Sequence, residues 1–264
     1  MPIPMDQIAN MPAFSSYYPM PPARYRQAQF QYVFFQADPA AIDRVLPACF
    51  EPVEDGLCAA IGISIPWSAN YGAFEESVLT VPCSYEGQMG YFTPVAFLNS
   101  RSSIPAGREI YGTPKVAADI TVAMDERVMF TDTQVAGASV LSIRSTMHKE
   151  ATVEEMPVLQ PAWRLKVIPR ADGPGAEVMQ LIDVSEVTTD VNVHICRAGD
   201  GVIECRPSPI YDLSDFMPNP MQAPIMWKWI IRKGTHGSLK IFWSKYFVLC
   251  VLYFVLCMIN MMSV

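Results

Sequence analysis

Short runs rich in aromatic and β-branched residues constrain what this chain can fold into more than any other feature. Such runs favour strands, because these side chains pack well on a pleated surface. Turn residues separate several of them, as at residues 172–175 and 198–201, which predicts hairpins. No pattern before residue 221 predicts a long helix. The predicted strands are residues 29–35, 57–66, 116–123, 126–135, 139–146, 165–169, 176–184, 191–196 and 202–205.

One short helix is predicted after Asp38, which is a good N-cap, and Pro39, which suits the first helical position. Pro47 ends it. The chain has 264 residues, of which 51% are hydrophobic and 17% charged, so it can bury a sizeable core. The pattern predicts a mainly β domain of the α+β type, with a few short helices and a barrel or otherwise closed sheet.

The two ends differ in composition from the middle of the chain. Residues 1–25 are rich in proline and predict an extended arm that lies over the domain at residues 26–225. Residues 226–264 are first basic and then, from residue 246 on, free of charge. Residues 246–264 are nearly as long as the roughly 20 apolar residues of a membrane-spanning helix. In such a helix the basic residues before it would stay in the cytosol. Three interpretations of this segment remain open, namely a tail anchor, a buried terminal helix and a misread exon boundary.

The charged and sulfur-containing residues exclude several classes of function. The net charge is −7 and no basic patch with interleaved aromatics occurs, so we expect no nucleic-acid partner. The seven cysteines form no CxxC pair, and the three histidines lie far apart. We therefore expect free thiols in a reducing compartment, and neither a metal site nor a cofactor. No secretory leader is evident, which predicts a cytoplasmic protein, with the tail anchor as the open alternative.

Two places in the sequence could carry chemistry. Glu75 and Glu76 form a carboxylate pair at the end of an apolar and aromatic stretch, residues 67–74. Lys115 follows Pro114 and leads an apolar predicted strand. Spacing alone favours a surface lysine whose aliphatic stem covers apolar residues.

Lys115 gains weight from the motif around it. Gly107-Arg108-Glu109, followed by residues 111–115, resembles the signature GRE-x-x-G/A-x-P-K of the acetoacetate decarboxylase family. Further segments resemble the family in the same order, and the likeness covers about residues 12–225. These segments are residues 18–22, 72–77, 164–173, 190–194 and 209–215. The resemblance implies a closed, cone-like β-barrel that forms homo-oligomers.

The resemblance also implies a mechanism. Lys115 would be the catalytic nucleophile of a carboxy-lyase, forming a Schiff base with a β-keto acid, and Glu76 a second catalytic residue. No cofactor is implied. The candidate substrate-binding residues are Arg24, Arg26, Arg108 and Glu109.

Three positions depart from the family pattern. Val116 stands where a second lysine is common, Ala28 where the family has an active-site arginine, and Ile61 where it has a second glutamate. Arg24 or Arg26 is expected to replace the missing arginine. Without a neighbouring ammonium, burial in an apolar pocket is the remaining local way to activate the amine, a rule for which acetoacetate decarboxylase is itself a known example.

The loss of a carboxylate beside an apolar wall predicts a keto acid larger than acetoacetate. A long-chain β-keto acid, as in the polyketide-toxin pathways of filamentous fungi, would fit. Two alternatives remain open. One is an aldolase–dehydratase that forms the same imine, and the other is a non-catalytic binding protein on this fold.

Overall fold

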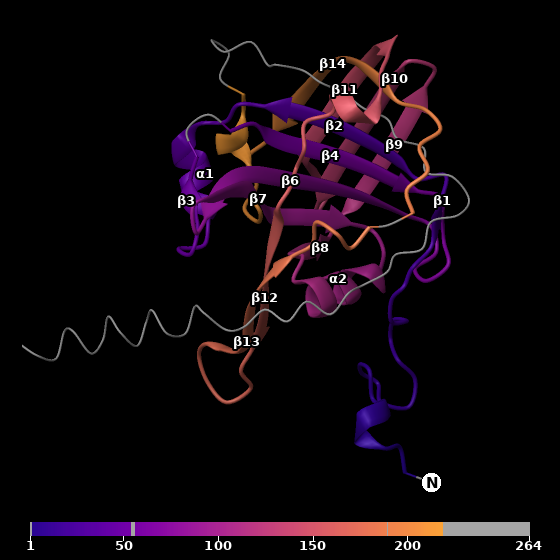
Figure 1. Cartoon of the computed structure of the whole chain (residues 1–264), viewed down its shortest axis with the longest axis vertical. Coiled ribbons are helices and arrows are strands. Elements are labelled where there is room, and N and C mark those ends of the chain that lie inside the picture. The colour runs from indigo at the N-terminus through magenta and orange to yellow at the C-terminus, as the bar shows by residue number, and fades with distance from the viewer. Residues whose placement is uncertain (1, 54–55, 189, 219–264) are drawn as a thin grey trace, which may run out of the picture.

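The computed structural model describes residues 2–53, 56–188 and 190–218, and two β-sheets dominate it (Figure 1). The smaller sheet has the order β14 (Arg197–Cys205), β11 (Ala138–Glu150), β10 (Val128–Val135) and β9 (Asp119–Asp125). The larger sheet has the order β13 (Ala176–Asp183), β12 (Ala162–Pro169), β7 (Gln88–Leu98), β6 (Phe74–Tyr85), β4 (Cys58–Ile65) and β2 (Gln29–Phe35), with β3 (Glu51–Pro52) beside β6 and β8 (Lys115–Ala117) beside β7.

The remaining elements are short. β1 (Tyr25–Arg26) pairs with β5 (Trp67–Ser68). The helices are α1 (Pro39–Val45), α2 (Ser103–Tyr111) and the 3-10 turns η1 (Met5–Gln7), η2 (Val153–Glu155) and η3 (Ser214–Phe216). α1 begins as predicted, because Asp38 Oδ1 accepts a hydrogen bond from the Ala40 backbone N–H at 2.8 Å.

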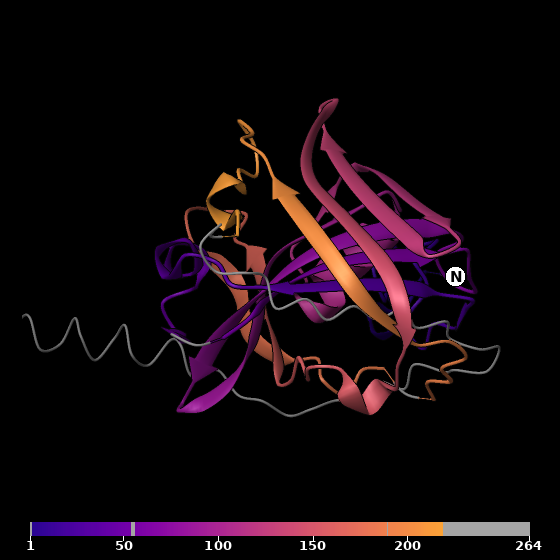
Figure 2. The same cartoon turned by 90° about the horizontal axis from the view of Figure 1, so that it is seen from above.

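The mainly β class is confirmed, but the closed barrel is not found. Within the described residues no pairing joins β13 to β2, and none joins the two sheets. The smaller sheet instead lies across one face of the larger one, as the view from above shows (Figure 2). Because one face is covered by a sheet and the other by loops, the structure buries its core without closing either sheet.

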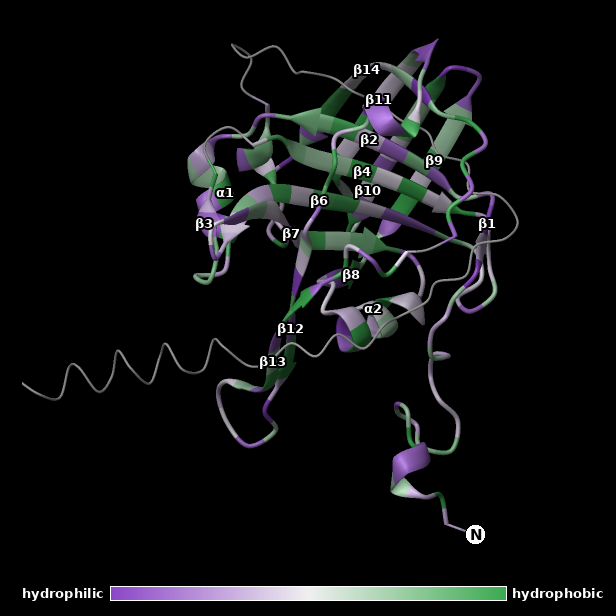
Figure 3. Ribbon diagram, in the orientation of Figure 1, coloured by the Kyte–Doolittle hydropathy of each residue, from purple (hydrophilic) through white to green (hydrophobic). Residues whose placement is uncertain are grey.

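Polar side chains join the two sheets at close range. Gln31 on β2 donates from Nε2 to the Met129 carbonyl oxygen at 3.0 Å and accepts from Thr131 Oγ1 at 2.7 Å. Gly62 on β4 faces the same threonine, and a Cβ there would lie 2.1 Å from Thr131 Oγ1. The sheets therefore approach too closely at this point for any side chain at residue 62. Hydrophobic residues continue along β4 and β7 in the middle of the larger sheet (Figure 3).

Several local predictions failed for identifiable reasons. β6 and β7 were not predicted, because both are buried on both faces for most of their length and show little alternation. Residues 191–196 are not a strand, and the turn predicted at residues 198–201 is wrong, because these residues lie within β14, which begins at Arg197. Residues 104–107 belong to α2, for which no helix was predicted, since Pro105 falls in the first helical turn, where its missing N–H is not needed.

The N-terminal arm only partly covers the domain. Tyr18 and Ala23 are buried, whereas η1 lies away from the body (Figure 1) and Phe14 is 82% exposed. The predicted tail, residues 226–264, lies outside the described residues. In the described part of the chain no helix has the length and apolarity needed to cross a bilayer.

Candidate active site

A cavity of about 670 Å³ lies on the face of the larger sheet that points away from the smaller sheet. Alternate residues of three neighbouring strands line it, because successive side chains of a strand point to opposite faces. On β4, Ile63 lies opposite Phe30 on one side and Glu76 on the other. The contributions from these strands are Phe30 and Tyr32 (β2), Ile61, Ile63 and Ile65 (β4), and Phe74, Glu76, Val78 and Thr80 (β6).

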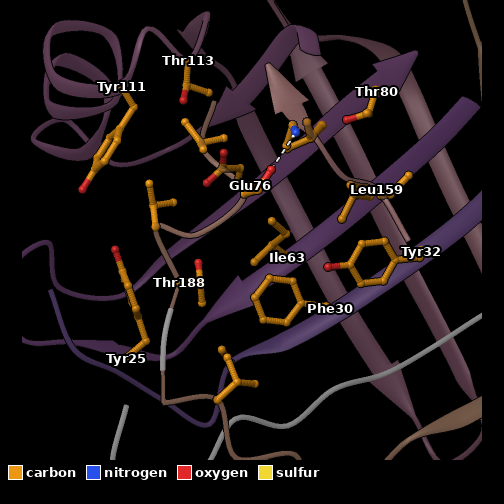
Figure 4. Close-up of a pocket in the computed structure, with 18 of the residues that line it drawn as sticks. Tyr25, Phe30, Tyr32, Ile63, Glu76, Thr80, Tyr111, Thr113, Leu159 and Thr188 are labelled. Atoms are coloured by element: carbon orange, nitrogen blue, oxygen red, sulfur yellow. Dashed lines mark hydrogen bonds between the residues drawn. The ribbon is translucent and has the colours of Figure 1, made fainter. Parts of the chain in front are cut away.

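The opposite wall comes from segments far away in sequence. Residues 153–160 contribute Met156 and Leu159. The other segment contributes three valines, a serine and a threonine, which are Val184, Val187, Val191, Ser185 and Thr188. The C-terminal end of α2 adds Tyr111, followed by Thr113 and Lys115. The close-up shows a polar end with Tyr25, Tyr111 and Glu76 and an apolar end with Phe30, Ile63 and Leu159 (Figure 4).

Lys115 and Glu76 meet inside this cavity. Lys115 Nζ lies 3.5 Å from Glu76 Oε2, and a dashed line marks this contact in Figure 4. Nζ also donates a hydrogen bond to Ser103 Oγ at 3.2 Å. The two charged side chains are only 13% and 12% exposed. Lys115 is the first residue of β8 and pairs in parallel with Ala96 on β7. Because β7 also pairs with β6, only β7 lies between Lys115 and the strand that carries Glu76. A largely buried amine beside a carboxylate can exchange protons with it and can attack a carbonyl carbon bound in the cavity.

The GRE motif acts around Lys115. Arg108 Nη1 donates to the Lys115 carbonyl oxygen at 3.2 Å, and Glu109 accepts from the Tyr18 hydroxyl at 2.5 Å. Neither Arg108 nor Glu109 lines the cavity. The motif therefore positions the lysine and the arm, and a substrate-binding role for these two residues remains a prediction without a contact to the cavity.

Gly107 on α2 lies directly against the side chain of Lys115. A Cβ at this position would lie 2.4 Å from Lys115 Cδ and 2.7 Å from Cε. We expect Gly107→Ala to displace the lysine side chain and to lower the rate at which the amine attacks a bound carbonyl carbon about a hundredfold. Alanine is also the better helix former, so the melting temperature should not fall with the activity.

Steady-state kinetics and thermal unfolding check this expectation together. Gly173→Ala is the matched control, because nothing lies within 4 Å of a Cβ there. Equal activity of the two variants would show that the lysine tolerates the added methyl group.

Arg24 and Arg26 are not brought to the cavity. Tyr25 lines the cavity, and its two neighbours on the chain therefore point away from it. Both arginines are exposed, and Arg26 stacks on the Trp67 ring with its Cζ 4.5 Å from the ring centre. The missing family arginine is thus not replaced from this segment.

The structure adds a cation that the sequence did not single out. Arg164 on β12 lines the cavity, and burial lowers the pKa of its guanidinium to about 10, which leaves it charged at neutral pH. The nearby carboxylates of Glu76 and Asp183 oppose this effect. Burial also raises the pKa of Tyr111, so its hydroxyl stays protonated. The only sequence signal was a charged residue directly before the predicted strand at residues 165–169.

The positions that depart from the family pattern also fall at this site. Ala28 and Ile61 both line the cavity, whereas Val116 packs against the core next to it. Ala28 and Ile61 therefore add apolar side chains to the cavity wall. Among the described residues, no three His, Cys, Asp or Glu side chains gather in a way that could hold a metal ion.

Comparisons with known proteins identify relatives of this chain. The model of the family "Acetoacetate decarboxylase (ADC)" matches residues 8–232. An acetoacetate decarboxylase of Bordetella avium is 30% identical over 215 residues, covering 78% of this chain and 83% of its own. The solved acetoacetate decarboxylase of Legionella pneumophila is 25% identical, with a TM-score of 0.74, over 89% of this chain and 92% of that one.

A more distant likeness concerns the fold alone. The enduracididine biosynthesis enzyme MppR, solved with the condensation product of pyruvate and imidazole 4-carboxaldehyde, is 18% identical with a TM-score of 0.67. The likeness covers 88% of this chain and 93% of that one. The family match spans most of the sequence and includes the lysine motif. The chain belongs to the acetoacetate decarboxylase family.

Proposed function

We propose that this protein decarboxylates a β-keto acid through a Schiff base on Lys115, with Glu76 as its acid–base partner. The observation that carries the proposal is the largely buried contact between Lys115 Nζ and Glu76 Oε2 at the polar end of an apolar cavity. Membership of the family supports the reaction class.

The steps balance without a cofactor. The neutral amine of Lys115 attacks the keto carbon, and loss of water gives a protonated imine. The bond between the α-carbon and the carboxylate carbon then breaks, and carbon dioxide leaves. The electron pair of this bond forms the carbon–carbon double bond of an enamine, while the nitrogen takes up the electrons of the imine double bond. A proton then adds to the α-carbon, and water releases the ketone and the free amine. The net reaction consumes one proton, and Glu76 is placed to take and return protons at the amine.

The size and lining of the cavity support a long or bulky substrate. Its volume of about 670 Å³ lies in the range of pockets that hold drug-sized ligands. Phe30, Ile63 and Leu159 form its apolar end (Figure 4), and Ile61 adds to the same wall. We propose a β-keto acid with an extended apolar chain, such as an intermediate of fungal polyketide biosynthesis.

A chain-length series tests this function. We expect kcat/KM to rise at least about tenfold from 3-oxobutanoate to 3-oxooctanoate, because each buried methylene contributes about 0.8 kcal/mol. Carbon dioxide release and the methyl ketone product are measured together, after subtraction of the spontaneous rate. A preference for 3-oxobutanoate would contradict the larger substrate, and no release from any member would contradict the decarboxylase.

An aldolase–dehydratase is the second candidate. The specific observation in its favour is the fold likeness to MppR in complex with a condensation product. Incubation with pyruvate and an aldehyde would then give an unsaturated condensation product detectable by mass spectrometry. A non-catalytic binding protein would give neither product.

A further inference from the structure

Two unpaired polar atoms belong to residues that line the same cavity. Within the part of the chain that the structure describes, Tyr111 Oη and Arg164 Nε are buried without a hydrogen-bond partner. Both residues line the cavity. A buried donor without a partner costs about 1–3 kcal/mol, so native proteins rarely keep one without a use. Two such donors on one cavity indicate a ligand with oxygen acceptors.

The two residues come from elements that touch each other. α2 packs against β12, and a Cβ on Gly112, which follows Tyr111, would lie 2.6 Å from the Lys166 backbone. Arg164 precedes Lys166 by two positions, and its Nη1 donates to the Trp163 carbonyl oxygen at 2.8 Å. That bond fixes the guanidinium and leaves Nε for another acceptor.

The charges of the cavity favour an anion. Among the residues that the structure describes, the charged side chains that line it are Glu76, Lys115 and Arg164. Lys115 pairs with Glu76 at 3.5 Å, so the lining carries one positive charge beyond this pair. An arginine in a site sheltered from water binds a carboxylate through charge-assisted hydrogen bonds.

We propose that Arg164 binds the carboxylate of the keto acid, with the Tyr111 hydroxyl as a second donor. Arg164 would thereby take the place of the family arginine that is absent at Ala28. The inference rests on the proposed function, because it takes a keto acid as the ligand. It also orients this ligand, with the carboxylate at β12, the keto carbon at Lys115 and the chain toward Phe30, Ile63 and Leu159.

Binding of unreactive ligands tests the anion site without any turnover. Octanoate carries the carboxylate, octanamide is its neutral counterpart, and neither has a keto group that could form an imine. Isothermal titration calorimetry compares both on the full chain. We expect Arg164→Met to weaken octanoate binding about 10- to 100-fold and octanamide binding less than about threefold. Tyr111→Phe should weaken octanoate binding about fivefold.

Two further variants keep the test decisive. Arg26→Met is the matched control, because that arginine is exposed, and it should change neither affinity. Arg164→Lys keeps the charge without the planar donor group, so octanoate binding should fall less than in Arg164→Met. It also serves as the test variant should the methionine variant not fold. An unchanged octanoate affinity, or an equal loss for both ligands, overturns the inference.

The kinetic consequence separates this inference from the proposed function. An arginine that holds a carboxylate before it leaves lowers KM more than it raises kcat, so Arg164→Met should mainly raise KM. If the protein releases no carbon dioxide but Arg164→Met still loses its octanoate preference, the anion site stands and the decarboxylase falls. If turnover is normal and the preference for octanoate over octanamide survives in Arg164→Met, the anion site falls alone.

Discussion

Replacing Lys115 by methionine is expected to lower kcat for β-keto acid decarboxylation at least about a thousandfold. The amine is the nucleophile in the proposed reaction, and no other lysine lines the cavity in the described part of the chain. Methionine keeps an unbranched chain of similar length, so the apolar walls should persist. Carbon dioxide release from 3-oxooctanoate measures the effect.

Two variants separate chemistry from stability. Lys115→Arg keeps a cation beside Glu76 but cannot form an imine, so it should be as inactive as the methionine variant. Lys149→Met changes an exposed lysine on β11 and should leave kcat within about twofold. Folded Lys115 variants that release carbon dioxide at the normal rate would refute the nucleophile.

The second large effect is expected at Glu76. Glu76→Gln keeps the shape of the side chain but removes the group that exchanges protons with Lys115, and general acid–base partners contribute about 10²- to 10⁴-fold. The loss should fall on kcat more than on KM. The amide can still accept a hydrogen bond from Lys115 Nζ, so the cavity should keep its form.

The neighbouring residue offers a matched control. Glu75 is adjacent on β6, outside the cavity lining, and its backbone N–H is bonded to Asn99 Oδ1 at 2.8 Å. Glu75→Gln should therefore change kcat by less than about twofold. Equal losses in the two variants would mean that the effect is structural and that Glu76 has no special part in the reaction.

Most strands could be located from the sequence, whereas β6, β7 and the helix that supports Lys115 could not. Residues 29–35 match β2 in full, because aromatic and β-branched residues gather there. α2 contains Pro105 and Gly107, which both argue against a helix when read locally. The close approach of Lys115 Cδ explains why a glycine stands at residue 107, and only the folded structure shows this contact.

The residues of the site also fall into those that the sequence indicated and those that it did not. The family resemblance pointed to Lys115 and Glu76, and the structure brings them within 3.5 Å. Arg164 could not be singled out, because it reaches the cavity only through the parallel pairing of β12 with β7. Arg24 and Arg26 were chosen for their closeness to Ala28 in sequence, but Tyr25 between them takes the inward position.

Borohydride trapping tests the central claim most directly. The protein is incubated with 3-oxooctanoate and sodium borohydride, digested, and mapped by mass spectrometry. We predict a stable secondary amine on Lys115, carrying the carbon chain of the ketone product, and none without the keto acid. Full turnover with no label on Lys115, or with the label on another lysine, would contradict the Schiff-base mechanism.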